Sequence, residues 1–515
     1  MKVEEYLQYD GVGLSELARS RQVSPRELLE VAIERIEAAN PALNAVIDRW
    51  YERARAALTS GLPEGPLFAV PFLLKDTLEV AGTRLTYGSV AARHNLGRQT
   101  HELARRHEAA GLQLLGRTNM SEIGLLPTTE PALYGATVNP WNAQHSAGGS
   151  SGGAAAAVAA GMVPLAHADD GGGSIRIPAS ACGVFGFKPS RGRNPSDERE
   201  APLGFIQTHC VSRTVRDSAE LLDATHGSLP GDVYCAPAPP SSYRQACERQ
   251  PARLRIAFTD HDFEGTRAHE DCCAAVRATA KLCSELGHEV EMAAPPIDGR
   301  AFNEAFLVIW GMCGGYFVRA VEQAIIERHV PKLLAPIAKP ASAALLALSS
   351  VSLRRAPFER FTRRLAALDR QHHPADVWMA SEVLNRSARQ LATFFGKYDV
   401  LLTPVLAEPP WKLGTFRDEA SDEEVKAQLL RYVGFTPLAN ASGTPSMSSP
   451  GHINGAGLPI GVQFMGAWAD EHRLFSLAGQ LEREVDWGRR WPPVVAKPAV
   501  GREDVSVSAA DPSPP

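Results

Sequence analysis

Two short glycine–serine tracts enclose an alanine-rich segment, and this arrangement constrains the fold more than any other feature of the 515-residue chain. The tracts cover residues 148–153 and 171–174, and they place Ser150 and Ser174 24 positions apart (150 to 174). Residues 154–160 between them contain only alanine and valine. A helix without a polar face is buried on all sides. We therefore expect this helix inside the protein, with a glycine tract at each end.

The segments on either side of this region predict alternating strands and helices. Residues 24–27 have the pattern of a capping box with proline at the first helical position, so we expect an amphipathic helix that ends at Asn40-Pro41. Further elements are expected as strands at residues 45–47, 67–74, 111–116, 398–404 and 458–464 and as a helix at residues 102–110. This alternation favours an α/β architecture.

Between about residues 300 and 395 the pattern becomes mainly helical. Candidate helices lie at residues 320–326, 341–353 and 358–368, and we expect this section to shape a pocket. Residues 497–515 are rich in proline, serine and alanine and lack a core pattern, which predicts a disordered tail. The chain is therefore expected to form a single domain over residues 1–496.

Composition excludes several classes of partner. The formal net charge is −5 and like charges do not cluster, so neither a nucleic-acid site nor a polybasic membrane anchor is expected. The N-terminal segment lacks the pattern of a signal peptide, and the longest apolar stretches, residues 153–168 and 341–353, are too short or too broken for a membrane span. The eight cysteines form no CxxC pair, which fits reduced thiols in a cytoplasmic protein. A small molecule is the expected partner.

The second glycine tract is suited to stabilising negative charge. Glycine has no Cβ, so the N–H groups of Gly171, Gly172 and Gly173 with Ser174 could converge on one point and form an oxyanion hole. A serine hydroxyl is a weak nucleophile until a base removes its proton. Lys75, which follows the apolar run 67–74, can be that base if burial lowers its pKa from the ordinary value of about 10.4. Its neighbour Asp76 must then point elsewhere.

Other interpretations of the same residues remain open at this stage. The tract at residues 148–153 could be a phosphate loop, but it lacks the lysine of GxxxxGK[ST]. Both tracts could be simple turns, and Lys75 could mark a strand that reaches the surface. A Ser-His-Asp triad through His145 or His167 is conceivable, although no GxSxG motif frames a serine. No HExxH or clustered Cys/His spacing indicates a metal site.

The longer motifs resemble those of the amidase signature family. The resemblance rests on GGSSGG at residues 148–153, DGGGSIRIP at 170–178 and CGVFGFKP at 182–189. It extends to PFLLKD at 71–76, GRTN at 116–119, NPWN at 139–142, residues 440–450 and GLPIGVQ at 457–463. It covers most of residues 10–485 and implies a mixed central sheet flanked by helices.

The resemblance also implies roles for individual residues. Ser174 is the implied nucleophile, Ser150 the bridging serine that follows a cis peptide bond from Gly149, and Lys75 the general base. Three further residues match positions that support the loop by hydrogen bonding: Ser151, Asp170 and Arg176. The implied reaction is hydrolysis of a carbon–nitrogen amide bond without a cofactor.

Two positions depart from the family pattern. Asp169 stands where the family usually has threonine or another uncharged polar residue, and His145 stands where it often has arginine or lysine. A carboxylate directed into the oxyanion hole would oppose negative charge there. We therefore expect Asp169 to face away or to be paired.

Within the family, TTEP at residues 128–131, Ala166-His167 and IPAS at 177–180 resemble bacterial hydrolases of cyclic nylon oligomers and arylamidase-like enzymes. Those enzymes have a cysteine in the pocket, in a helical region similar to IWGMC at 309–313, which makes Cys313 a candidate pocket residue. Thr128, the first residue of TTEP, is a second candidate. A buried cysteine acting as a small apolar group is the alternative interpretation of Cys313.

We expect an amidase that acts on a bulky aryl or alkyl amide, with a carbamate or an ester as further candidate substrates. One alternative is the glutamine-hydrolysing subunit of a tRNA-dependent amidotransferase, which shares the catalytic triad. Another is an inactive binding protein that keeps the fold. A homodimer is an assembly that the sequence leaves open.

Overall fold

The computed structural model describes residues 1–196, 203–329, 358–416 and 420–496. Within these ranges, strands from all parts of the chain form one 11-stranded sheet in the order β1-β3-β2-β4-β6-β5-β10-β11-β9-β7-β8. The strands are β1 (Val46–Arg49), β2 (Pro71–Lys75), β3 (Gln113–Thr118), β4 (Leu165–Asp170), β5 (Phe185–Lys188), β6 (Gln207–Ser212), β7 (Arg255–Phe258), β8 (Glu289–Met292), β9 (Val400–Pro404), β10 (Ser446–Ile453) and β11 (Pro459–Gly466).

The sheet is mixed, as predicted. Strand β2 pairs in parallel with β3 and β4, whereas the pairs from β4–β6 through β11–β9 are antiparallel. Strand β7 then pairs in parallel with β9 and β8. Because parallel strands bring their carboxyl ends to the same edge, the ends of β2, β3 and β4 lie together.

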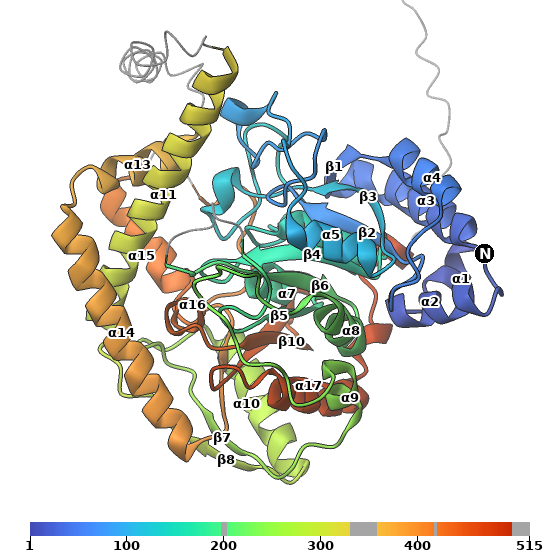
Figure 1. The fold of residues 1–515 in the computed structure, drawn as a ribbon. Helices are drawn as coiled ribbons and strands as arrows, with labels where there is room; N and C mark the ends of the chain where they lie inside the picture. Colours follow the sequence, from blue (N-terminus) through green and yellow to red (C-terminus); the bar gives the residue numbers. More distant parts are fainter. Residues whose placement is uncertain (197–202, 330–357, 417–419, 497–515) are drawn as a thin grey trace, which may run out of the picture.

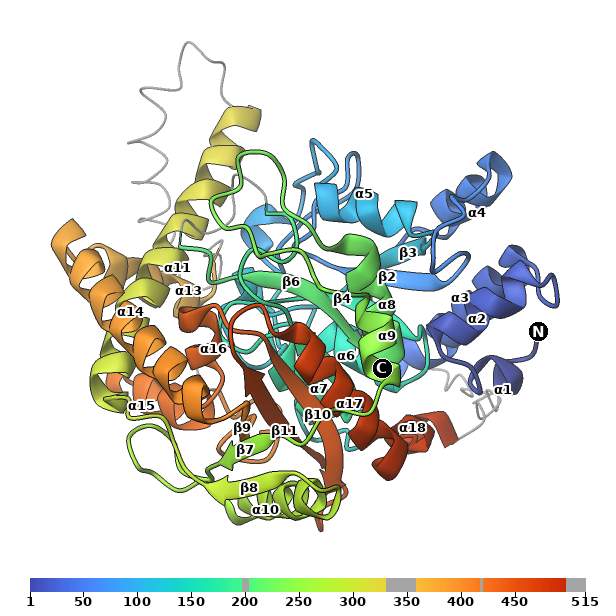
Figure 2. The same ribbon diagram turned by 60° about the horizontal axis from the view of Figure 1, so that its bottom comes forward.

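Helices flank the sheet on both sides (Figures 1 and 2), which confirms the predicted α/β class. The first half contributes α1 (Val3–Tyr6), α2 (Gly11–Arg19), α3 (Pro25–Leu43), α4 (Tyr51–Ser60), α5 (Glu102–Ala109), α6 (Gly152–Ala159), α7 (Arg176–Cys182), α8 (Val215–Thr225) and α9 (Tyr243–Glu248). The second half contributes α10 (Glu270–Glu285), α11 (Gly299–His329), α13 (Arg360–Asp369), α14 (Pro374–Lys397), α15 (Asp422–Tyr432), α16 (Pro437–Ser442), α17 (Glu471–Val485) and α18 (Pro493–Ala496).

Helix α6 is the alanine-rich helix predicted between the glycine tracts, and all of its residues are buried. Its first turn is packed too tightly for larger side chains. A Cβ on Gly153 would lie 2.4 Å from the backbone nitrogen of Asn119 and 2.6 Å from the carbonyl oxygen of Ala45. The helix therefore holds the end of the first glycine tract against the loop that follows β3.

Helix α3 begins at the predicted capping box, but the prediction that it ends at Asn40-Pro41 is wrong. The helix continues through Pro41 to Leu43, and Asn44 then adopts a left-handed conformation with φ of 51°. Proline has no N–H, so the bond from position 41 to the carbonyl of Glu37 is lost, but the helix still closes with the Asn44 N–H donating to the Asn40 carbonyl at 2.8 Å. The Asn40 side chain also accepts the N–H groups of Ala45 and Val46, which fastens the helix end to β1.

Helices α11, α13 and α14 form the predicted helical section and lie together on one side of the molecule (Figure 1). The prediction of a short helix at residues 320–326 is wrong in extent, because α11 begins at Gly299. Glycines within α11 allow α13 to approach closely: a Cβ on Gly314 would lie 3.0 Å from Leu365 Cβ. The candidate helix at residues 341–353 and the expected tail at 497–515 lie outside the described residues.

Residues Gly299–Val321 of α11 are long and apolar enough to cross a membrane, with a mean hydropathy of 1.3 over the most apolar window. In this fold the same segment packs against α13 and α14 and lines a cavity. Length and composition alone are weak grounds for a membrane span, because helices that line a protein interior have the same composition.

Candidate active site

The carboxyl ends of β2 and β4 bring charged residues to one edge of the sheet. Strand β2 ends at Lys75, and β4 ends with Asp169 and Asp170. The two strands pair in parallel, so their last residues reach the same edge. The second glycine tract, residues 171–174, continues directly from β4. Residues that are almost 100 positions apart in the sequence (75 to 170) thus form one cluster.

Lys75 is fully buried and contacts two side chains through Nζ. This atom donates hydrogen bonds to Ser150 Oγ at 2.7 Å and to Asp169 Oδ1 at 2.5 Å. Burial lowers the pKa of Lys75 because it disfavours the charged form, and the negative charge of Asp169 opposes this shift. The net shift of the pKa is downward, toward the neutral amine that can accept a proton.

Asp76 points away from Lys75, as expected. Its carboxylate accepts hydrogen bonds from the backbone N–H groups of Thr86 at 3.2 Å and Gly88 at 3.3 Å, and it lies 3.6 Å from Arg117 Nε. A different carboxylate, that of Asp169, contacts Nζ directly. Asp169 is therefore paired, and its partner is the lysine itself.

The peptide bond between Gly149 and Ser150 is cis, which confirms the prediction from the family resemblance. Gly149 packs against the chain at Thr128, where a Cβ would lie 2.6 Å from both the backbone nitrogen and the carbonyl oxygen. Thr129 Oγ1 donates a hydrogen bond to the carbonyl oxygen of Gly148 at 2.9 Å. These contacts hold Ser150 Oγ in front of Lys75.

Ser174 is half-buried and lines a cavity together with Gly171 and Gly172. Among the described residues, the backbone N–H groups of Gly171, Gly172 and Ser174 donate to no backbone carbonyl. Gly173 differs, because its N–H donates to Asp170 Oδ1 at 2.7 Å and the residue itself is buried. The expectation that Gly173 contributes its N–H to the oxyanion hole is therefore wrong: the Asp170 carboxylate occupies that donor.

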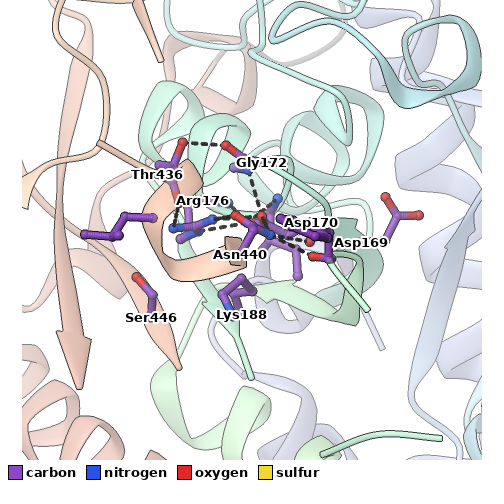
Figure 3. A network of polar contacts seen from close by, with 12 residues as sticks. Asp169, Asp170, Gly172, Arg176, Lys188, Thr436, Asn440 and Ser446 are labelled. Carbon is purple, nitrogen blue, oxygen red and sulfur yellow. Dashed lines mark hydrogen bonds and ion pairs between the residues drawn. The ribbon is translucent and has the colours of Figure 1, made fainter. Parts of the chain in front are cut away.

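Asp170 and Arg176 form a fully buried ion pair beneath the glycine tract (Figure 3). Arg176 donates from Nε to Asp170 Oδ2 and from Nη2 to Oδ1, both at 2.8 Å. Burial raises the pKa of Asp170, but the charge and hydrogen bonds of Arg176, the charge of Lys188 and the hydrogen bond from Asn440 together lower it to about 2. Asp170 also accepts the N–H of Ile175 at 3.2 Å, so it ties the tract to the start of α7. Ser151, the third supporting residue, donates through Oγ to the Asp169 carbonyl at 3.3 Å.

The C-terminal part of the chain completes this network. Arg176 donates to Asn440 Oδ1 at 2.6 Å, to Gln463 Oε1 at 2.6 Å and to the carbonyl of Thr436 at 2.9 Å. Thr436 Oγ1 in turn donates to the carbonyl oxygen of Gly172 at 2.6 Å. No role was expected for Thr436, Asn440 or Gln463 from the sequence. The available signal was the polar side chain of Gln463 within the otherwise apolar strand β11, which requires a buried partner.

The cavity in front of Ser174 has a volume of about 550 Å³. Its polar wall includes Thr77, His167, Asp169 and Thr208. Its apolar wall comes largely from α11 and from the loops after β2 and β3, and includes Leu85, Tyr87, Leu125, Leu126, Phe306, Ile309, Trp310 and Phe317. A Cβ on Gly172 would lie 3.4 Å from the ring of Phe306, so this ring stands beside the tract that carries Ser174.

The two candidate pocket residues have different positions. Cys313 lines the cavity from α11, and burial raises the pKa of its thiol to about 12, so the thiol is neutral. Thr128 does not line the cavity, so that expectation is wrong. Its neighbours Leu126 and Pro127 form the wall, while Thr128 is buried behind Gly149.

The histidines considered for a Ser-His-Asp triad do not form one. His167 accepts the backbone N–H of Lys75 through Nδ1 at 3.3 Å, and burial places its pKa well below the ordinary value. His145 lies in a turn and forms an isolated bridge with Lys412. Across the described ranges, no three His, Cys, Asp or Glu side chains are grouped so that they could hold a metal ion. Lys75, Ser150 and Asp169 instead form one hydrogen-bonded cluster, and Asp169 lines the cavity together with the titratable residues Glu79, His94 and His101.

Comparison with known proteins agrees with this geometry. The family profile described as Amidase matches residues 27–475. The chain belongs to the amidase signature family. The 6-aminohexanoate-cyclic-dimer hydrolase of Pseudomonas sp. (strain NK87) is 34% identical over 501 residues, which cover 94% of this chain and 97% of that protein.

Solved structures of other family members have the same fold. The 6-aminohexanoate cyclic dimer hydrolase complexed with substrate superposes with a TM-score of 0.86 at 32% identity and covers 95% of this chain and 99% of its own. A bacterial aryl acylamidase of the amidase signature family superposes with a TM-score of 0.82 at 26% identity, with the same coverage of 95% and 99%. The protein is thus an amidase, a hydrolase of carbon–nitrogen amide bonds.

Proposed function

We propose that this amidase hydrolyses its substrate through an acyl-enzyme on Ser174, with Ser150 and Lys75 as the proton relay. The observation that carries the proposal is the hydrogen bond of 2.7 Å between the buried Lys75 Nζ and Ser150 Oγ. A serine hydroxyl needs a base within hydrogen-bond reach, and a neutral lysine is such a base.

In the acylation step, neutral Lys75 accepts the proton of Ser150, and Ser150 accepts the proton of Ser174. Ser174 Oγ forms a bond to the carbonyl carbon, and the N–H groups of Gly171, Gly172 and Ser174 stabilise the resulting oxyanion. The carbon–nitrogen bond then breaks as Ser150 returns a proton to the leaving amine. Lys75 reprotonates Ser150, and water attacks the acyl-enzyme by the same relay.

Asp170 and Arg176 act on this chemistry by fixing the tract. The Asp170 carboxylate of the buried ion pair accepts the Gly173 N–H, whereas Gly171, Gly172 and Ser174 line the cavity. Ser151 links the two glycine tracts through the Asp169 carbonyl. Loss of any of these contacts would loosen an oxyanion hole that must be preorganised to be effective.

We further propose a bulky aryl or alkyl amide as the substrate, with carbamates and esters as additional candidates. The apolar wall formed by Phe306, Trp310 and Phe317 suits a large apolar group. Relatives that act on a cyclic aminohexanoate dimer and on aryl acylamides, according to their names, support the same substrate class. The small polar side chain of glutamine would leave this wall uncovered, which disfavours the amidotransferase alternative.

The test is hydrolysis of a panel of anilides, primary amides, carbamates and esters by the purified chain and by Ser174→Ala. We expect turnover of at least one bulky anilide or alkyl amide by the wild type and a fall of about 10³-fold or more in Ser174→Ala. Equal rates in the two proteins would refute the mechanism. Activity restricted to glutamine would refute the substrate class, and absence of turnover on the whole panel would favour the inactive binding protein.

A further inference from the structure

Asp169 connects Lys75, the last residue of β2, to Thr77, which lies two positions after the strand. Its Oδ1 accepts the hydrogen bond from Lys75 Nζ at 2.5 Å, and its Oδ2 accepts one from Thr77 Oγ1 at 2.5 Å. The Asp169 side chain is only 13% exposed and lines the cavity. Figure 3 shows it turned away from the Arg176 network that holds Asp170. The two neighbouring carboxylates thus serve different partners.

The other charged groups near Lys75 are engaged elsewhere. On β4, Asp170 is paired with Arg176, and His167 meets the Lys75 backbone with its neutral ring. On β3, Arg117 donates to the Lys75 carbonyl oxygen at 3.3 Å and lies beside Asp76. The buried face of α6 carries only glycine, alanine and valine. Asp169 is therefore the carboxylate in direct contact with Nζ, and the more distant Asp170 adds a smaller charge effect of the same sign.

We propose that Asp169 is a positioning residue that orients Lys75 Nζ toward Ser150 and whose negative charge sets the pH at which Lys75 becomes a base. The inference rests on the proposed function, because it assigns Asp169 an effect on the Lys75–Ser150 relay. It adds to the triad a residue at a position where the family pattern usually has an uncharged side chain.

The orientation follows from the hydrogen-bond chemistry of the amine. A carboxylate has no proton to donate, so Nζ must always direct an N–H bond at Asp169. When Lys75 loses a proton, the remaining bond to Asp169 leaves the lone pair free to face Ser150 Oγ. The carboxylate therefore selects the rotamer of the amine in which the lone pair can accept the Ser150 proton.

The effect of the charge has the opposite sign to the effect of burial. Burial lowers the pKa of Lys75, and the adjacent carboxylate raises it by favouring the ammonium form. With Asp169 present, the relay becomes competent at a higher pH than with a neutral residue in its place. A neutral replacement that keeps the acceptor oxygen should remove the charge effect alone.

The experiment measures the rate of inactivation by a fluorophosphonate probe as a function of pH. In this reaction Ser174 Oγ forms a bond to phosphorus, fluoride leaves, and the Ser174 proton passes through Ser150 to Lys75, so the rate reports the same base without a known substrate. The proteins compared are the wild type, Asp169→Asn, Asp169→Thr and Thr77→Val. Thermal unfolding of each variant establishes that it is folded.

We expect the acid limb of the profile to move to lower pH by about one unit or more in Asp169→Asn, because one adjacent carboxylate shifts a pKa by about 1–3 units. At a pH one unit below the wild-type midpoint, each rate can be expressed as a fraction of that protein's own plateau rate. A shift of one unit makes this fraction about five times larger in the variant than in the wild type. Asp169→Thr should shift in the same direction. Thr77→Val keeps the charge, so its acid limb should coincide with that of the wild type even where its plateau is lower.

Acid limbs of Asp169→Asn and Asp169→Thr that coincide with the wild-type limb would overturn the inference and leave Asp169 a structural role. A shift of equal size in Thr77→Val would also overturn it, because the effect would then not depend on the charge. Failure of the proposed function is distinct: in that case the wild-type chain would not be labelled at Ser174 at any pH.

Discussion

Lys75 Nζ lies 2.7 Å from Ser150 Oγ, and both residues are buried at the edge of the sheet where β2 ends. The contact joins a strand-end lysine to a serine 75 positions later in the chain. Burial and the hydrogen bond together make the pair a base, because an isolated serine would not titrate and a solvated lysine would be protonated.

The first prediction concerns the coupling of the two residues. Lys75→Met and Ser150→Ala should each lower kcat by about 10²- to 10⁴-fold, the range expected for loss of a general base. The double variant should be no slower than the slower single variant, because both changes interrupt one relay. Steady-state kinetics of the three variants on the best panel substrate measures this. Losses that multiply in the double variant would show that the two residues act separately.

The second prediction concerns the buried ion pair of Asp170 and Arg176. Asp170→Asn should lower the free energy of unfolding by about 3 kcal/mol at neutral pH, because it leaves a buried arginine without its counter-charge. The pKa of Asp170 is depressed to about 2, so its contribution to stability is present above the ordinary value of about 4 and is lost as the pH falls toward 2. Urea unfolding at several pH values should show the difference between wild type and variant shrinking over this window. A difference that stays constant down to pH 2 would contradict the assignment.

The third prediction concerns the cavity wall. Phe306→Ala should lower kcat/KM for bulky anilides by about tenfold and leave that for small primary amides nearly unchanged, because only a large substrate group reaches the ring. Trp378→Ala is the control, since Trp378 is 74% exposed on α14 and does not line the cavity. Equal losses on large and small substrates would contradict a role of Phe306 in substrate selection.

The fourth prediction concerns Gly149. A methyl group there would lie 2.6 Å from the Thr128 backbone, so Gly149→Ala should lower the thermal midpoint and strongly reduce activity. Gly396→Ala is the matched control, because a Cβ at this position of α14 meets no atom within 4 Å. The control should keep wild-type activity and equal or greater stability, since alanine favours helices over glycine. Wild-type stability and activity in Gly149→Ala would refute the close packing of the first glycine tract.

Features set by local pattern could be predicted from the sequence. The burial of α6 follows from an alanine run without a polar face, and the start of α3 follows from its capping box. The roles implied for Lys75, Ser150 and Ser174 came from motif resemblance, and the structure places Lys75 against Ser150. The two structural conclusions needed only residue types and their spacing, whereas the roles needed the resemblance to known motifs.

Features that depend on strand register or on tertiary packing could not be predicted from the sequence. The contact of Asp169 with Lys75 joins residues 94 positions apart and depends on the parallel pairing of β2 with β4. The use of the Gly173 N–H by Asp170 depends on how the tract turns into α7. The full length of α11 was not predicted. Glycine is unfavourable inside helices, but the glycines of α11 allow close packing against α13. Each of these depends on a tertiary contact that residue spacing does not encode.

The central claim is that Ser174 carries the acyl group. The most direct measurement is acid quenching of the enzyme during turnover of its best panel substrate, followed by peptide mass spectrometry of the wild type and of Ser174→Ala. The account predicts an added mass equal to the acyl group on the wild-type peptide that contains Ser174, and no such mass in the variant. An acyl group on another residue, or turnover by Ser174→Ala at the wild-type rate, would contradict it.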